Sequence, residues 1–258
     1  LRSGSLVTAR DRWMVIASDA QRLGNSAWEM LSRSTAATAD LQLGEFDASE
    51  AGCLQAMALA ESSGDHSMVL HLRYCLSSLN ALRGDADEAI RGFESIAQEA
   101  SEIGALRVLG QTVMTLGEIL RHIEKPEEAM THLERGERIL RATGQRVSLS
   151  RCLAERTLTA LALGDLPAAQ SFAAGAGMAA SLSAGVLLGQ ERVHAALGRV
   201  AEAQGDRHAL SSARFATIES LDLQVVHLGE EHLGRWISVV PRLEAVTWAG
   251  WSPNRGAS

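Results

Sequence analysis

Apolar residues recur every three or four positions through most of the chain, and glycine-centred breaks interrupt them at regular intervals. One such stripe runs from His66 to Arg83, and a second runs from Ala89 to Ala100 and ends at Gly104. Steps of three and four residues place the apolar side chains on one face of a helix. The pattern therefore predicts amphipathic helices that are joined in pairs by short turns.

The breaks follow a fixed period of about forty residues, in two interleaved series. The first series is Gly24, Gly64, Gly104 and Gly144, and the second is Gly44, Gly84, Gly164 and Gly205, with Glu124 where the second lacks its glycine. Two series on one period indicate a two-part unit that is copied several times. Periods in this range are typical of solenoids built from stacked helix pairs.

Each predicted turn carries its own chemistry. Gly84 is expected to adopt the left-handed backbone that ends a helix, and Asp85 to cap the next helix. Pro126 stands near a first helical position, where its missing N–H costs nothing. A small or β-branched residue precedes each turn by seven positions and would let two helices approach closely. These residues are Ala37, Ser77, Gly117, Thr157 and Gly198.

Each unit has a small residue, a turn seven positions later, and an alanine such as Ala48 or Ala89 within the next five residues. This pattern resembles the tetratricopeptide repeat (TPR) over about residues 26–222. Phe93 and Leu133 stand where that family prefers an aromatic side chain. The period is nevertheless longer than the 34 residues of a TPR. Long repeats of this kind are similar to those of LuxR-type ATP-dependent regulators and related multidomain signal-transduction ATPases. The resemblance implies an all-α, right-handed α-solenoid of about five TPR-like helix pairs plus capping helices.

The ends depart from the repeat, and a closing helix is expected at 224–240. Trp248 and Trp251 would serve either a self-cap or a dimer contact. Because the first residue is Leu1, a fragment of a longer protein is favoured over a processed mature chain. The expected organisation is an N-terminal capping helix at 1–24, with 1–5 in part a cloning remnant, a TPR-like repeat domain at 25–240 and a partly disordered C-terminal tail at 241–258.

Composition excludes several partner classes. The formal charge is −7, so phosphate backbones do not attract the chain as a whole, and direct nucleic-acid binding is not expected. No apolar run reaches the roughly 18 residues of a membrane span, so no membrane partner is expected. The cysteines, Cys53, Cys75 and Cys152, are odd in number and far apart, which favours core positions and a reducing cytoplasm.

Signatures of catalysis are missing from the sequence. It has no GxxxxGK[ST], GxSxG or HExxH motif, and Gly175 and Gly177 lie in an alanine-rich helical stretch where close packing explains them. His227 and His232 are five apart, which does not align them on one helical face as a metal site requires. We therefore expect no enzymatic activity, no cofactor and no metal.

The TPR resemblance also implies a binding site, because the first helix of each pair lines a concave groove in that family. Arginines there would pair bidentately with carboxylates of a partner, and the alternative is that these are ordinary solvated helix residues. The predicted groove residues are His71, Tyr74, Ser78, Gln111, Met114, Glu118, Arg121, His122, Arg151, Arg192 and Arg199.

The expected function is a protein–protein interaction or sensor module from a bacterial multidomain transcription or signalling regulator. Its partner would be a protein or peptide, another domain of the same polypeptide, or a small effector. The alternative is a free-standing cytoplasmic TPR adaptor. An enzyme is a third reading, for which the sequence supplies no nucleophile or cofactor loop.

Overall fold

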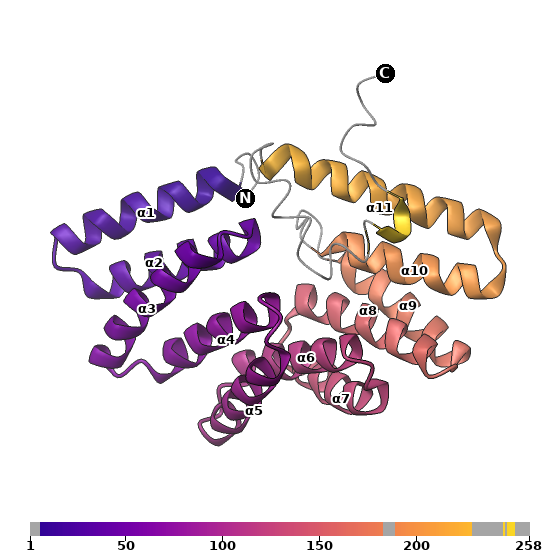
Figure 1. The fold of residues 1–258 in the computed structure, drawn as a ribbon, viewed down its shortest axis with the longest axis horizontal. Coiled ribbons are helices and arrows are strands. Elements are labelled where there is room, and N and C mark those ends of the chain that lie inside the picture. The colour runs from indigo at the N-terminus through magenta and orange to yellow at the C-terminus, as the bar shows by residue number, and fades with distance from the viewer. Residues whose placement is uncertain (1–5, 183–188, 229–244, 246, 251–258) are drawn as a thin grey trace. The chain divides into compact units, whose positions relative to one another are not determined.

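The computed structural model describes residues 6–182, 189–228, 245 and 247–250, with side chains omitted at 225–228. All the regular secondary structure in these ranges is helical, as predicted, and consecutive helices form antiparallel hairpins (Figure 1). The helices are α1 (Leu6–Arg22), α2 (Ser26–Leu43), α3 (Phe46–Ser63), α4 (His66–Leu82), α5 (Ala86–Glu102), α6 (Leu106–His122), α7 (Pro126–Ala142), α8 (Arg146–Ala162), α9 (Leu166–Ser181), α10 (Gln190–Gln204) and α11 (Arg207–Leu228).

The chain divides into two compact units. Unit 1 comprises Leu1–Val108 and Val225–Val239, and unit 2 comprises Leu109–Gln224 and Val240–Ser258. The three-part organisation expected from the sequence stays a prediction. The five predicted helix pairs are present as α2/α3, α4/α5, α6/α7, α8/α9 and α10/α11.

Unit 1 is a stack in which each of the helices α1 to α5 packs against the next. Its core is made of small side chains: Cys53, Ala56 and Leu72 are fully buried between α3 and α4. Phe93 of α5 is also fully buried, at the position where a TPR prefers an aromatic residue. The second helices thus fill the space between consecutive first helices.

Unit 2 repeats this arrangement with α8 at its centre. The helix packs against α7, α9 and α10, so the first helices α8 and α10 are direct neighbours. Leu133 of α7, Cys152 of α8 and Ala196 of α10 are fully buried in one continuous core. The three cysteines of the chain are buried and free, as the sequence predicts.

The turns confirm the glycine series. Gly84 has φ +92°, in the left-handed region that suits glycine, and the Asp85 carboxylate accepts a hydrogen bond of 3.1 Å from the Glu88 amide. Glu124 occupies the turn that lacks a glycine and keeps φ +61°, alone among the described non-glycine residues. The backbone of the repeat is therefore conserved in shape even where the residue is unfavourable.

The small residues before the turns allow close helix contacts. A Cβ at Gly117 would lie 2.6 Å from Leu133 Cγ, so only glycine fits between α6 and α7. A Cβ at Gly52 would lie 3.0 Å from Ala37 Cβ, and one at Gly92 would meet Ser77 Oγ. The residues that face Ala37 and Ser77 are themselves glycines, fifteen positions downstream, and were not predicted from the sequence.

Two expectations are wrong in detail. Helix α11 runs unbroken from Arg207 to Leu228, across the boundary predicted near 222–224. Ala48 is exposed, and Ser49 fills the buried place in the first repeat by donating a 2.8 Å hydrogen bond to the Ala37 carbonyl. The rest of the predicted closing helix, Trp251 and His232 lie outside the described residues. None of the described helices is long and apolar enough to cross a membrane.

Candidate functional site

The predicted groove positions of unit 2 come together in a cluster of charges that links three first helices. Glu118 of α6 is buried, at 6% exposure, and its carboxylate accepts a 2.9 Å hydrogen bond from Arg192 of α10. Arg151 of α8 donates to the other oxygen of the same carboxylate, at 3.4 Å. The glutamate therefore ties α6 to both later first helices.

A second ion pair extends the cluster along α6 and α8. Arg121 Nε donates to Glu155 Oε2 at 2.8 Å, and both side chains are largely buried. The Arg121 guanidinium also lies 3.2 Å from His122 Nε2. We use the name charge cluster for Glu118, Arg121, Arg151, Glu155 and Arg192. Its three arginines and two glutamates give a mixed-sign inner face, as the sequence predicts.

The electrostatics of Glu118 follow from its surroundings. Burial by itself raises the pKa of this carboxyl group, but the positive charges of Arg192 and Arg151 outweigh it and lower the pKa to about 2. The Nε–H groups of Arg151 and Arg192 are buried without a hydrogen-bond acceptor in the described part of the chain. A buried charge that keeps its ionised form must be paired, so the cluster is part of the folded structure of unit 2.

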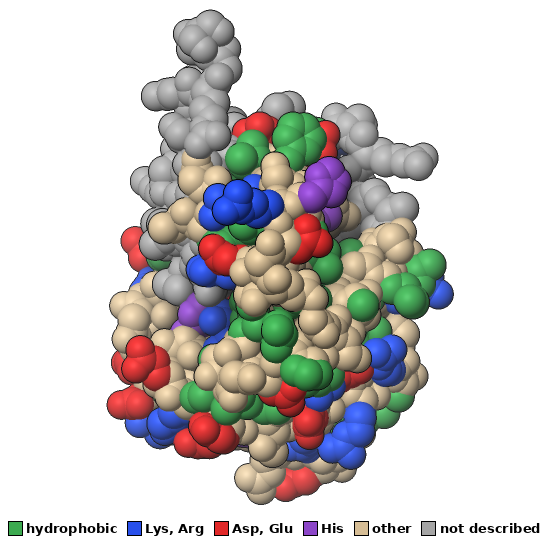
Figure 2. Space-filling model, turned by 90° about the vertical axis from the view of Figure 1, so that its right-hand side faces the viewer, with side chains coloured by type: hydrophobic (Ala, Val, Ile, Leu, Met, Phe, Trp, Pro, Cys, Tyr) green, Lys and Arg blue, Asp and Glu red, His purple; other side chains and the backbone are tan. Residues whose placement is uncertain are grey.

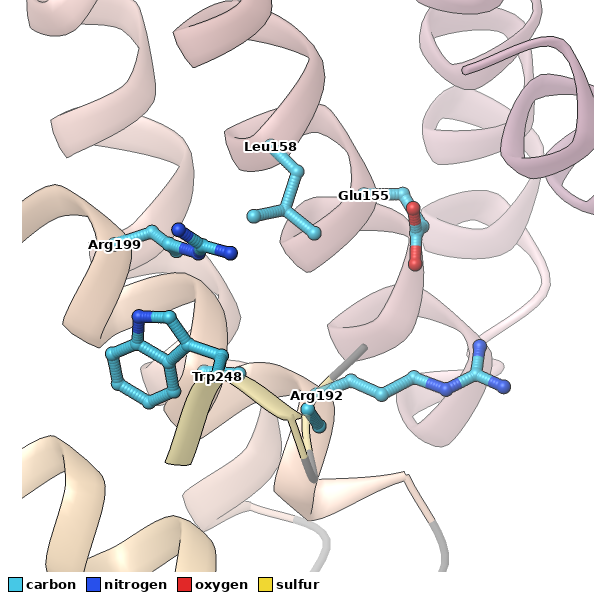
Figure 3. A pocket seen from close by; sticks show the side chains of 7 residues that line it. Glu155, Leu158, Arg192, Arg199 and Trp248 are labelled. Atoms are coloured by element: carbon cyan, nitrogen blue, oxygen red, sulfur yellow. The ribbon is translucent and has the colours of Figure 1, made fainter. Parts of the chain in front are cut away.

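A pocket lies beside the cluster, between α8, α10 and the C-terminal segment. It is small, with a cavity volume of about 20 Å³, and is partly open to solvent; Figure 3 shows Glu155, Leu158, Arg192, Arg199 and Trp248 around it. Arg192 stands thirteen positions before its turn, and Leu158 and Arg199 stand six before theirs. The pocket is therefore lined by positions that the repeat period assigns to the groove.

The remaining predicted residues behave differently. Tyr74 packs edge-on against the buried Phe93, with ring centroids 5.4 Å apart, and stacks on His71 at 6.5 Å. The Ser78 hydroxyl donates to the Tyr74 carbonyl of its own helix at 2.9 Å. These residues of unit 1 are half-buried, as is Gln111 of α6.

Met114 cannot face a partner, which corrects its assignment to the groove. Its side chain is 1% exposed and belongs to the core that includes Leu140, Leu149 and Leu153. Because α8 stacks against this part of unit 2, it covers a position that an isolated α6 would expose. Glu155 was not predicted as a site residue; its signal in the sequence is a charge on the buried face of α8, between Cys152 and Thr159.

The chemistry of metals and cofactors finds little support among the described residues. They contain no group of three or more side chains suited to hold a metal ion. Gly175 and Gly177 lie inside helix α9, as the packing interpretation requires. The side chain of His227 and the residues 229–232 are outside the described part, so the histidine prediction there stays a prediction.

The surface offers mixed charge as well. Acidic and basic side chains are interspersed with apolar ones on the face drawn in Figure 2. Among the side chains coloured there, neither sign of charge forms a continuous field. A partner that covers this face therefore meets both signs of charge, and its affinity would depend on complementary pairing rather than on net attraction.

Comparisons with known proteins agree on the fold. No protein-family model and no curated protein matches the chain. A Rap protein complexed with competence and sporulation factor superposes with a TM-score of 0.69 and 10% identity, covering 94% of this chain and 68% of that one. BtubC (BKLC) from P. vanneervenii gives a TM-score of 0.64 and 15% identity, covering 84% of this chain and 91% of that one.

A third similar structure is described as containing TPR-like repeats. It is a putative kinesin light chain from Podosopora anserina with nearly identical TPR-like repeats, with a TM-score of 0.54 and 15% identity, covering 76% of this chain and 97% of that one. Identities this low show the fold alone. The chain therefore has the fold of a TPR-like helical repeat protein, and its link to LuxR-type regulators stays a prediction.

Proposed function

We propose that this protein is a non-catalytic interaction module that binds a protein or peptide segment on the first helices of unit 2. The pocket beside the charge cluster is the observation that carries this proposal. There Leu158, Arg192 and Arg199 converge, and all three stand at repeat positions that the TPR resemblance assigns to ligand contact. The Rap protein with this fold was solved in complex with a factor, which supports binding as the role of such a surface.

The side chains define what the partner must present. The side chains of Arg199 and Arg151 keep 42% and 28% exposure. Leu158 lines the pocket together with Arg199, is half-buried and supplies an apolar contact. A partner segment with a carboxylate next to an apolar side chain satisfies both, because a guanidinium binds carboxylate oxygens through paired N–H groups.

The test replaces two groove arginines and compares the result with a control substitution on α7, the second helix of the α6/α7 pair. The double variant Arg151→Gln and Arg199→Gln removes both exposed charges and leaves Arg192 to pair with Glu118. With the intact chain as bait, we expect it to capture its partner at least tenfold less well than the wild type. Arg138→Gln, at an exposed site on α7, should capture as much as the wild type.

Circular dichroism and melting curves show whether the variants stay folded. The Arg199–Glu202 pair is a surface ion pair, with both side chains more than 40% exposed, so its loss should hardly change stability. Charge reversal of Arg151 and Arg192 together is a poor test, since it would place like charges around the buried Glu118. Equal capture by the double variant and the wild type would contradict the proposed surface.

The origin of the chain is a separate part of the proposal. The long TPR-like repeat supports a place in a bacterial multidomain transcription or signalling regulator, whose other domains, regulatory proteins or small effectors would be the ligands. A free-standing cytoplasmic adaptor is the alternative. The full-length gene separates the two, because a P-loop ATPase domain upstream and a helix-turn-helix domain downstream would favour the regulator.

A further inference from the structure

The C-terminal segment places one tryptophan against a glycine of the groove helix. Trp248 is 9% exposed, and its ring covers Gly198 of α10. A Cβ at position 198 would lie 2.0 Å from the Trp248 ring and 3.1 Å from Ala213 Cβ of α11. The ring therefore packs directly against the backbone of α10 at position 198, where any side chain larger than that of glycine would clash with it.

Polar contacts complete the seat of the indole. The Trp248 Nε1–H donates to Glu202 at 3.3 Å. The guanidinium carbons of Arg199 and Arg214 lie 5.9 Å and 5.4 Å from the ring centre, within the range of cation–π attraction. Both arginines also pair with Glu202. An acceptor for the N–H and two cations for the ring are features that suit an indole better than a phenyl ring.

The seat lies in the groove rather than at an unrelated place. Ala245 and Trp248 line the same pocket as Leu158, Arg192 and Arg199, and Figure 3 shows the Trp248 ring next to the Arg199 side chain. Ala245 and Ala249 are 2% and 8% exposed, and with Trp248 they pack in a core cluster with residues of α10 and α11. The C-terminal segment therefore occupies part of the surface that a partner would use.

We propose that the C-terminal segment that carries Ala245 and Trp248 is an intramolecular ligand of this groove, and that a partner displaces it by inserting a tryptophan of its own into the Trp248 seat. This inference rests on the proposed function and names its ligand class, a peptide segment with an exposed indole. The side chains of Arg199, Glu202 and Arg214, which contact the indole, are partly solvent-exposed, so these contacts hold the segment weakly and its attachment to the chain supplies the rest. Tethering typically gives an effective concentration in the millimolar range.

The probe for the test is a fluorescein-labelled synthetic peptide with the sequence of residues 241–256 of this chain. In the full-length chain, Trp248→Ala empties the seat. We expect this variant to bind the peptide at least tenfold more tightly than the wild type, whose own segment competes. The same peptide carrying Trp248→Ala should not bind either protein. Fluorescence anisotropy measures all four combinations.

Gly198→Ala tests the geometry of the seat. Added to the Trp248→Ala chain, it fills the space that the indole needs, and alanine is a better helix former than glycine, so the chain should stay folded. We expect peptide binding to fall at least tenfold. Gly177→Ala of α9 is the matched control, because its Cβ would lie at an ordinary 3.8 Å from Leu197 and should leave peptide binding unchanged.

Three results would overturn the inference. One is a folded Trp248→Ala chain that does not bind the peptide up to about 1 mM, the concentration a tether typically provides. Another is equal binding with and without Gly198→Ala. The third is a wild-type dimer, measured by light scattering, that dissociates with Trp248→Ala, since the seat would then serve a second copy.

Failure of this inference is distinguishable from failure of the proposed function. If the arginine double variant loses its partner while the peptide never binds, unit 2 is a binding surface and the segment is a fixed part of the fold. If the peptide binds as expected while the arginine variant keeps its partner, the seat exists and the proposed surface for that partner is wrong.

Discussion

The first helices of the two units differ at the same position of the repeat, six residues before the turn. In unit 1 this position holds Thr38 and Ser78, and each hydroxyl donates a 2.9 Å hydrogen bond to a carbonyl of its own helix. In unit 2 it holds Glu118, Leu158 and Arg199, and Glu118 pairs with Arg151 and Arg192 on two other helices. A short hydroxyl can be satisfied locally, whereas a buried carboxylate needs cations from its neighbours.

The position thirteen residues before the turn shows the same contrast. His71 of unit 1 stacks on Tyr74, and burial lowers the pKa of its imidazole, which favours the neutral form. Unit 2 has Gln111 of α6, Arg151 of α8 and Arg192 of α10 at this position. The repeat thus supplies one backbone frame, and the residues at two positions decide whether an inner face is held by neutral contacts or by ion pairs. This difference is why the proposed binding surface lies in unit 2.

The largest expected effect comes from removing the two side chains that define the contrast. Glu118→Ala leaves the largely buried Arg192 and the partly buried Arg151 without their carboxylate, which should cost about 3 kcal/mol of unfolding free energy. Ser78→Ala removes a hydrogen bond within one helix and should cost about 0.5 kcal/mol. Urea denaturation of both variants measures the difference.

Both substitutions introduce alanine at the same repeat position, which makes the two variants directly comparable. Helix propensity therefore contributes little to the difference. If Glu118→Ala is no more destabilising than Ser78→Ala, the ion pairs of unit 2 do not hold its first helices together. The contrast between the units would then be one of composition alone.

Acid should weaken unit 2 through the same glutamate. The pKa of Glu118 is lowered to about 2 in the folded chain, against an ordinary value of 4.5, so its ionised form stabilises the fold above about pH 4.5. That contribution is lost as the pH falls from about 4.5 to about 2. We expect the melting temperature of the wild type to fall more steeply over this range than that of Glu118→Gln, whose amide does not titrate. Parallel slopes in calorimetry would contradict this assignment.

The smallest expected effect compares one turn from each unit. The left-handed backbone costs conformational free energy at Glu124 but not at Gly84, so Glu124→Gly should stabilise the chain by about 1 kcal/mol. Gly84→Ala introduces the same strain and should destabilise it by about 1 kcal/mol. A Cβ at Gly84 would meet no atom within 4 Å, so the effect reports backbone conformation and not crowding. Thermal melts that shift in the same direction for both variants would show that the turns are not equivalent.

Much of the fold could be predicted because its determinants are local. Gly84 and Asp85 set a helix end and a helix start from their own backbone and side chain, and Gly117 signals close packing by its size alone. The predicted boundary near 222–224 is wrong because helix α11 continues through residues that include no helix-breaking residue. The assignment of Met114 to the groove was wrong because the stacking of a neighbouring helix, and not the apolar stripe on α6, decides which face of α6 stays exposed.

The site could be predicted only in part. The repeat period found Glu118, Arg151 and Arg192, since equivalent positions of stacked helices lie on one face. It did not show that these side chains pair with one another. Nor did it show that Trp248 lies over Gly198, a contact between residues fifty positions apart that no local pattern encodes.

The sequence by itself determined the helices, the period and the turns, because each depends on residues within a few positions of one another. The tertiary structure decided which charges are neutralised and what covers the groove. Arg192 and Glu118 are separated by 74 residues and meet only after the first helices stack. Interactions of that range depend on the packed arrangement of several repeats, so they follow from the folded chain and not from any single copy.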